Sequence, residues 1–202
     1  MRMTAPPDSP GRLDDAVLIE QSRHRPESFA ALYDRYFGDI YRYVAARVGP
    51  HAADDLASET FLVAFRKRHG FDPDRGVVRH WLYGIATNLL ADHRRGETRR
   101  LEALARVPVE DPAEGEHADR VAARVSAAAA RRHLATELGR LPAGDRDVLF
   151  LVAYGDLSYE EIARTLEIPS GTVASRLNRV RRKLRAALDD IDITAESGGS
   201  DG

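Results

Sequence analysis

Apolar residues recur every three or four positions over most of the chain, which is the spacing of one face of an α-helix. The clearest stretch runs from Phe29 to Val48 and ends at Gly49-Pro50, a pair that stops helices. The same spacing predicts helices from Asp14 to His24, from Ala52 to Arg68 and from Val78 to Arg95. Alternating β-branched residues, the usual sign of a strand, are scarce. The pattern therefore predicts an all-α fold.

The helical pattern weakens between Gly96 and Gly139. This segment contains Pro108, Pro112 and a cluster of acidic residues, which disfavour a continuous packed helix. We therefore expect two small helical domains joined by a flexible acidic linker. The predicted boundaries are an N-terminal tail and short helix over 1–25, a first domain over 26–100, the linker over 101–137, a second domain over 138–189 and a disordered tail over 190–202.

The second domain contains a helix-turn-helix pattern. Ser158 and Glu161 have the spacing of a capping box, in which the serine hydroxyl accepts from the Glu161 amide and the Glu161 carboxylate accepts from the serine amide. Pro169 ends this short helix and Ser170 begins the next one. The second helix has one apolar stripe, formed by Val173, Leu177, Val180, Leu184 and Leu188. A short helix, a tight turn and a second helix form the geometry that enters a DNA major groove.

One edge of this second helix is polar and cationic. At roughly 100° per residue, its members lie about a third of a turn from the apolar stripe. Arginine can form two hydrogen bonds with guanine, and serine or threonine hydroxyls can contact bases or phosphates. The edge consists of Thr172, Ser175, Arg176, Arg179 and Lys183. We predict that these residues contact DNA.

The helix predicted from Ala52 to Arg68 has a wide apolar arc and one narrow exposed edge. The edge contains two acidic residues and a leucine. Its members are Asp55, Ser58, Glu59, Leu62 and Arg66. A solvated polar strip and a protein-binding surface both fit this pattern.

The helix that begins near Val78 places Trp81, Leu82 and Ile85 on one side, so Trp81 is expected in the core and not as a platform for base stacking. The opposite side combines small, polar and cationic residues, which allow a nucleic-acid backbone to approach closely. They are His80, Gly84, Thr87, Asn88 and Ala91, with Arg94 and Arg95 at the end of the helix.

The formal net charge is only −2, so a nucleic-acid surface must arise from local segregation of charge. Residues 66–106 contain ten basic and five acidic side chains, and residues 170–188 contain six basic and no acidic ones. Without cysteine, the chain has no disulfide or thiolate metal site. Because the sequence has no phosphate-binding glycine loop, nucleophile elbow or metal-binding histidine pair, we predict no enzymatic activity, no metal and no cofactor. No apolar run is long enough to cross a bilayer, and a cytoplasmic location is expected.

The second domain resembles the C-terminal promoter-reading domain of extracytoplasmic-function sigma factors. The similar motifs are Leu141-Pro142, the segments Leu157 to Ala163 and Pro169 to Val173, and Ser175-Arg176-Leu177. The resemblance implies that the polar edge described above reads the −35 promoter element. Glu167 departs from the family pattern, because glycine is common at this position of the turn.

Two segments of the first domain resemble the same family. Asp55 to Phe61 is similar to the segment by which sigma factors bind the clamp helices of the largest RNA polymerase subunit, and His80 to Asn88 is similar to the helix that reads the −10 element. The resemblance implies core-polymerase contacts from Asp55, Ser58, Glu59 and Leu62. It implies −10 contacts from Arg75, Arg79, His80, Asn88, Arg94 and Arg95.

Together these motifs predict a non-enzymatic initiation factor whose partners are core RNA polymerase and promoter DNA. In many members of the family an anti-sigma factor is a further partner, and the linker, here acidic from Glu110 to Asp119, threads the RNA path of the polymerase. One alternative is a LuxR-type helix-turn-helix regulator that binds operator DNA without polymerase. Another is a sigma-like protein that occupies polymerase without opening promoters. The first-domain motifs favour the sigma factor over both.

Overall fold

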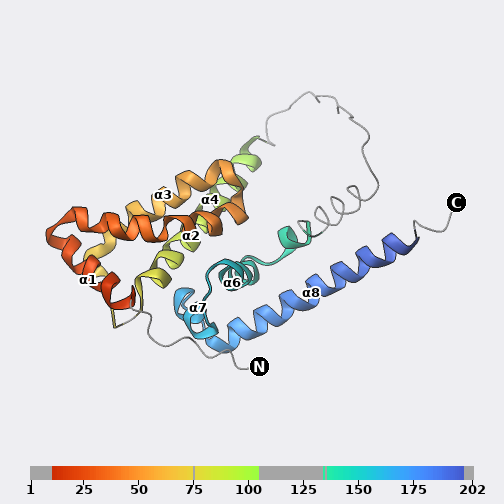
Figure 1. The fold of residues 1–202 in the computed structure, drawn as a ribbon. Helices are drawn as coiled ribbons and strands as arrows, with labels where there is room; N and C mark the ends of the chain where they lie inside the picture. Colours follow the sequence, from red (N-terminus) through yellow and green to blue (C-terminus); the bar gives the residue numbers. More distant parts are fainter. Residues whose placement is uncertain (1–10, 75, 105–133, 135, 198–202) are drawn as a thin grey trace.

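The computed structural model describes residues 11–74, 76–104, 134 and 136–197 (Figure 1). Within these ranges all regular structure is helical, which confirms the predicted all-α fold. The acidic segment from Glu110 to Asp119 and the candidate residue Arg75 lie outside the described residues. No helix in the described part of the chain has the length and apolarity that a membrane crossing needs.

The first unit consists of three long helices preceded by a shorter one. Its elements are α1 (Gly11–His24), the 3-10 turn η1 (Pro26–Phe29), α2 (Ala30–Val48), α3 (Pro50–Lys67), the 3-10 turn η2 (Arg68–Gly70) and α4 (Val78–Leu104). Gly49 separates α2 from α3 at φ +80°, a left-handed conformation that glycine adopts without strain. Pro50 can then begin α3 directly, because the first helical turn tolerates proline.

Aromatic rings join the helices of the first unit. Tyr33 and Phe37 of α2 lie 5.0 and 6.1 Å from the ring of Phe61 in α3, measured between centroids. Tyr43 of α2 meets Tyr83 of α4 edge to face at 5.1 Å. Each such contact adds on the order of 1 kcal/mol beyond area burial. The helices α2, α3 and α4 all pack against one another and together form the core of this unit.

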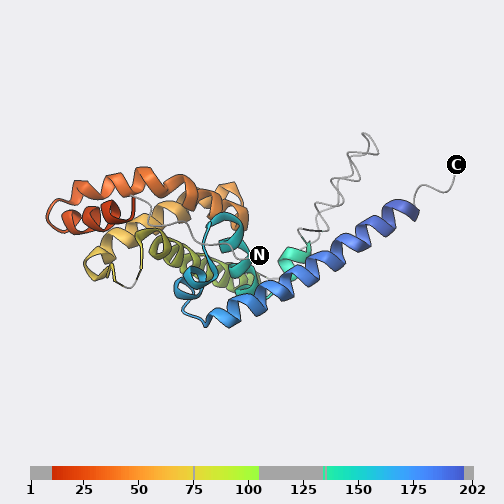
Figure 2. The same cartoon turned by 60° about the horizontal axis from the view of Figure 1, so that its bottom comes forward.

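The second unit is smaller and has an aliphatic core. It contains α6 (Ala143–Tyr154), α7 (Tyr159–Thr165) and α8 (Ser170–Ser197), with α6 and α7 both packed on α8. Three members of the predicted apolar stripe, Val173, Leu177 and Val180, are buried, whereas Leu188 is half exposed. The stripe therefore packs most tightly along the first half of α8. Ala187 is a further buried residue of this helix, and its C-terminal end projects away from both units (Figure 2).

Two helices extend beyond their predicted ends. α4 continues to Leu104, about nine residues past Arg95, and α8 continues to Ser197 into the segment predicted as a disordered tail. Residues 189–197 contain neither glycine nor proline, and the glycine pair that stops helices comes only at 198–199. In α4, Gly96 costs only about 1 kcal/mol relative to alanine inside a helix, and no proline follows before Leu104.

The two units are in contact. α7 packs against α4, and α6 packs against α2. Their buried apolar residues form one continuous cluster that includes residues of both units. Figures 1 and 2 show the second unit seated beside α2 and α4 in both views.

Candidate nucleic-acid interface

The acidic edge of α3 is on the surface. Asp55 and Ser58 are exposed, and Glu59 is half-buried. Leu62 is 42% exposed, so an accessible apolar side chain lies among these polar groups. The four residues predicted to contact polymerase therefore share one accessible strip of acidic, polar and apolar groups.

The face of α4 predicted to read the −10 element is mostly covered. His80 is 7% exposed and Thr87 is 5% exposed, although both were predicted on the open side of the helix. The Thr87 hydroxyl donates to the Tyr83 carbonyl oxygen at 2.7 Å and lies 2.7 Å from the Tyr43 hydroxyl. Asn88 is exposed as predicted. The prediction that His80 and Thr87 lie on an open side is therefore wrong. His80 contacts Glu161 of α7 and Thr87 contacts Tyr43 of α2, and the helical pattern contains no information about these covering helices.

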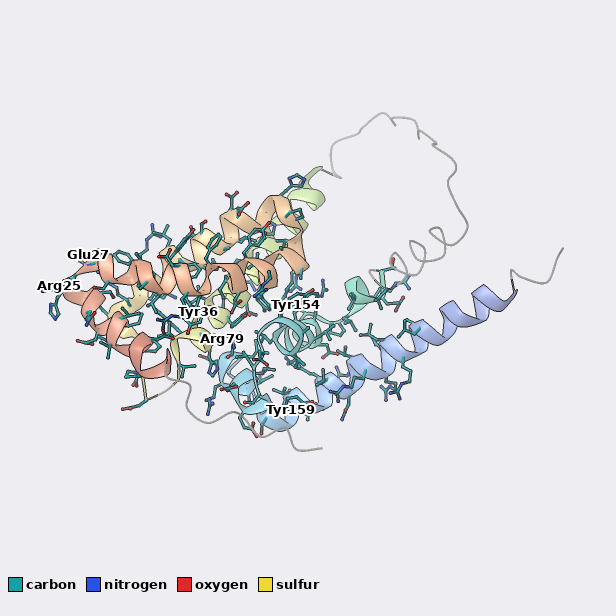
Figure 3. The ribbon with its side chains drawn as sticks, in the orientation of Figure 1. Arg25, Glu27, Tyr36, Arg79, Tyr154 and Tyr159 are labelled. Atoms are coloured by element: carbon teal, nitrogen blue, oxygen red, sulfur yellow. The ribbon has the colours of Figure 1, made fainter. Side chains whose placement is uncertain are left out.

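The cationic candidates of α4 differ in their surroundings. Arg79 is half-buried, lies 3.4 Å from the Asp39 carboxylate and stacks over the Tyr83 ring at 5.8 Å (Figure 3). Arg95 is exposed and pairs with Asp92, and Arg94 is half-buried. Trp81 contacts Phe71 at 5.1 Å between ring centroids and packs against the core, as predicted.

The helix-turn-helix has the predicted local geometry. The Ser158 amide donates to Glu161 Oε2 at 2.8 Å, and the Glu161 amide donates to Ser158 Oγ at 3.3 Å, so the capping box is complete. The turn between α7 and α8 places Glu167 at φ +54°. This is the left-handed conformation that glycine adopts most readily, and here a glutamate occupies it.

The edge of α8 predicted to contact DNA divides into two groups. Ser175 and Lys183 are exposed, and the Ser175 hydroxyl donates to the Thr172 carbonyl oxygen at 3.0 Å. Arg176 lies against Gly144, and Arg179 pairs at 3.2 Å with the buried carboxylate of Asp145. Both arginines therefore extend along the N-terminus of α6, while Arg179 remains 46% exposed at its side chain. The ion pair orients Arg179 before any DNA is bound.

Three further polar residues of α8 were not among the predicted contacts. Asn178, Arg182 and Arg185 are exposed and line a shallow groove together with Arg181. They lie three, seven and ten positions after Ser175, so helical spacing from Ser175 is the signal that could have identified this face. The cationic side chains of Arg182 and Arg185 suit contacts with phosphates.

The buried tyrosines of the first unit are structural groups. Burial raises the pKa of Tyr83 to about 12, and burial also raises the pKa of Tyr43 and of Tyr36. The Tyr43 hydroxyl accepts a hydrogen bond from Arg47 at 2.9 Å. At neutral pH these phenols keep their protons and act as hydrogen-bond donors.

Comparison with known proteins places both units in one family. The family model "Sigma-70 region 2" matches residues 32–100, and "Sigma-70, region 4" matches residues 131–184. SigL of Mycobacterium tuberculosis, an ECF RNA polymerase sigma factor, is 32% identical over 165 residues that cover 81% of this chain and 90% of SigL. SigW of Bacillus subtilis, also an ECF sigma factor, is 32% identical over 177 residues that cover 82% of this chain and 91% of SigW.

Longer relatives match as well. SigE of Mycolicibacterium smegmatis is 38% identical over 80% of this chain, and BldN of Streptomyces coelicolor is 33% identical over 86% of it. This chain spans only 62% of the length of SigE and 65% of that of BldN.

Solved structures share the fold. CnrH, solved in complex with the cytosolic domain of CnrY, superposes with a TM-score of 0.62 at 28% identity, covering 87% of this chain and 97% of that one. RpoE of Bartonella quintana, solved with the anti-sigma factor NepR, has the same fold with a TM-score of 0.61 at 21% identity, covering 81% of this chain and 98% of that one. The two family models together match more than half of the chain and show the sigma-70 class. Within that class, this chain belongs to the extracytoplasmic-function sigma factors.

Proposed function

We propose that this chain binds core RNA polymerase through the exposed edge of α3 and directs it to promoters through α4 and α8. Asp55, Ser58, Glu59 and Leu62 contact the polymerase. Arg75, Arg79, His80, Asn88, Arg94 and Arg95 contact the −10 element. Thr172, Ser175, Arg176, Arg179 and Lys183 contact the −35 element. The chemistry of RNA synthesis remains with the polymerase.

The observation that supports this proposal best is the accessible edge of α3. An isolated helix-turn-helix regulator needs no exposed strip of acids around a leucine on a second helical unit. Asp55 and Glu59 suit a cationic protein partner, and Leu62 supplies apolar contact area beside them. An anti-sigma factor belongs among the proposed partners, since the family resemblance implies one and CnrH was solved bound to the cytosolic domain of another protein.

The proposal is tested by transcription with purified core enzyme across a promoter library. The variant Asp55→Lys/Glu59→Lys should bind core at least about tenfold more weakly, because both charges then oppose a cationic partner. Its matched control is Glu27→Lys/Asp34→Lys, which changes the net charge equally on exposed positions of η1 and α2. We expect the control to bind core within about twofold of the unsubstituted chain at the same salt concentration.

The two outcomes separate the candidate functions. Equal loss of core binding in both variants would assign the effect to total charge and remove the special role of α3. Sequence-specific DNA binding by the free chain, with no promoter-directed transcription in the presence of core, would support the LuxR-type alternative.

A further inference from the structure

Helix α1 precedes the part of the first unit that matches the sigma-70 region 2 model, which begins at residue 32. It is nevertheless well packed, because Asp15, Ile19 and Ser22 are each at most 2% exposed. These residues lie three or four positions apart, so they share one face of the helix. α1 packs against α2, α4 and the 3-10 turns η1 and η2. It is therefore fixed relative to the long helices of its unit.

Two hydrogen bonds in opposite directions join the C-terminal end of α1 to the segment that precedes α4. Arg23 Nη2 donates to the Phe71 carbonyl oxygen at 3.2 Å, and Arg68 Nε of η2 donates to the Ser22 carbonyl oxygen at 3.1 Å. Ser22 belongs to the last turn of α1, where carbonyl oxygens lack donors within the helix, so Arg68 satisfies one of them. Arg68 also donates to the Phe65 carbonyl oxygen at 2.6 Å and lies over the Phe65 ring.

Phe71 is held through its amide, its carbonyl and its ring. The amide donates to the Arg68 carbonyl oxygen at 3.3 Å, and the carbonyl accepts from Arg23. The ring is 8% exposed and lies 5.1 Å from the ring of Trp81 in α4, measured between centroids. The three residues that follow, 72–74, are exposed. Phe71 is therefore the fixed point from which the chain leaves η2 before it enters α4.

The other end of α1 is tied to α2. The buried carboxylate of Asp15 accepts hydrogen bonds from Arg35 and from Tyr36, which Figure 3 labels. Burial raises the pKa of Tyr36, and the nearby charges of Arg35 and Arg79 oppose this rise. Arg79, in the first turn of α4, pairs with Asp39 of α2 at 3.4 Å. α1 is thus bonded at one end to the part of α2 beside Arg79 and at the other end to the segment from which α4 starts.

We propose that Arg23 is a positioning residue for promoter recognition. By holding the Phe71 carbonyl, it fixes the path by which the chain enters α4, and with it Arg79, so it sharpens the choice of −10 sequence without touching DNA. The inference rests on the proposed function, in which Arg79 contacts the −10 element. The Arg23 side chain is only 27% exposed, and its other terminal nitrogen pairs with Glu20 at 2.8 Å. Both ends of the planar guanidinium are therefore bonded, and its orientation is set before DNA binds.

The test uses the full chain with core polymerase on promoters changed base by base in the −10 and −35 elements. Arg23→Ala should reduce discrimination among −10 sequences about three- to tenfold, because loss of a charged hydrogen bond frees the entry into α4. Discrimination among −35 sequences and affinity for core should stay within about twofold, because Glu20 and Phe71, the partners of Arg23, lie on neither of those surfaces. Arg23→Lys keeps a donor of similar reach and should recover about half or more of the lost discrimination.

Two matched controls isolate the bond to Phe71. Arg25→Ala removes the same charge from an exposed position close by, and Glu20→Ala removes the ion-pair partner of Arg23 while leaving the Phe71 bond in place. Both controls should keep −10 discrimination within about twofold of the unsubstituted chain. A loss in Arg25→Ala equal to that in Arg23→Ala would assign the effect to charge and overturn the proposal.

Amide exchange on the free chain is a second measurement that needs no polymerase. Arg23→Ala should speed exchange of the Phe71 amide about tenfold or more and leave the amides of α8 unchanged, because only the segment before α4 loses its anchor.

Three results would contradict the proposal. Unchanged −10 discrimination in Arg23→Ala would remove the role of Arg23 whatever the exchange shows. A uniform loss across all promoters would make Arg23 a phosphate contact. An equal loss at −10 and −35 would make it a general stabilising residue. If the unsubstituted chain itself directs no promoter-specific transcription with core, the proposed function fails, whereas the exchange result still reports separately whether Arg23 holds Phe71.

Discussion

The two helices proposed to read promoter DNA, α4 and α8, differ in how their surfaces are divided between packing and solvent. α4 packs against α2, α3 and α7, and among its described candidate residues Asn88 and Arg95 are exposed. α8 uses one narrow stripe for packing and leaves a broad polar face open. Folding and recognition therefore share residues in α4 and are largely separate in α8. Substitutions in the two helices should differ accordingly.

The largest difference is expected between two neighbouring residues of α4. Thr87→Val removes a hydroxyl that donates to the Tyr83 carbonyl oxygen and contacts the Tyr43 hydroxyl, so it should destabilise the chain by about 1–2 kcal/mol. Asn88→Ala changes an exposed side chain and should alter the unfolding free energy by less than about 0.5 kcal/mol. Urea unfolding followed by circular dichroism measures both. Equal costs would mean that α4 is no more constrained than a surface helix.

Arg179 is the main exception to the separation of packing and recognition in α8, because it belongs to the open face of this helix and also pairs with the buried Asp145. Arg179→Ala should lower stability by about 1 kcal/mol, since Asp145 loses its cation but the half-exposed site readily admits water. It should also reduce discrimination among −35 sequences by about 1–3 kcal/mol if the guanidinium contacts a base.

Two companion variants separate these effects. Adding Asp145→Asn to Arg179→Ala should recover stability without recovering −35 discrimination, because the buried charge is removed while the DNA contact stays lost. Ser175→Ala should affect DNA binding alone, since Ser175 is exposed and bonds only locally to the Thr172 carbonyl oxygen. A loss of stability in Ser175→Ala as large as in Arg179→Ala would show that α8 also combines both tasks.

The smallest effect is expected in the turn that orients α8. Glu167→Gly should stabilise the second unit by about 0.5–1 kcal/mol. The left-handed conformation costs a residue with a side chain about 1–2 kcal/mol, and glycine avoids this cost. The larger backbone entropy that glycine loses on folding offsets part of the gain. Thermal unfolding should show a higher midpoint. Promoter preference should stay the same, because Glu167 lies outside the polar edge of α8. A lower midpoint would mean that the glutamate side chain itself stabilises the turn.

The helices and the local motifs could be predicted from the sequence because their causes are local. The Ser158–Glu161 capping box, the Gly49-Pro50 break and the exposed edge of α3 all follow from spacing within one helix or turn. The burial of His80 could not be predicted in this way, because its partner Glu161 is distant along the chain and belongs to another unit. The pairing of Arg179 with Asp145 could not be predicted either, because these two residues are also distant along the chain. Periodicity shows which side of a helix is polar, and only tertiary structure shows what covers that side.

The double role of Glu161 has a consequence for protein engineering. Exchanging the second unit between relatives is an obvious route to sigma factors with new promoter preferences. An incoming unit whose capping box uses glutamate also retains a carboxylate at this position, since Oε2 completes the box and Oε1 is left to face residue 80. Such a chimera would therefore inherit part of the contact between the two units along with its helix-turn-helix. Residue 80 of the recipient, and not the grafted unit alone, would then need to be chosen when such hybrids are designed.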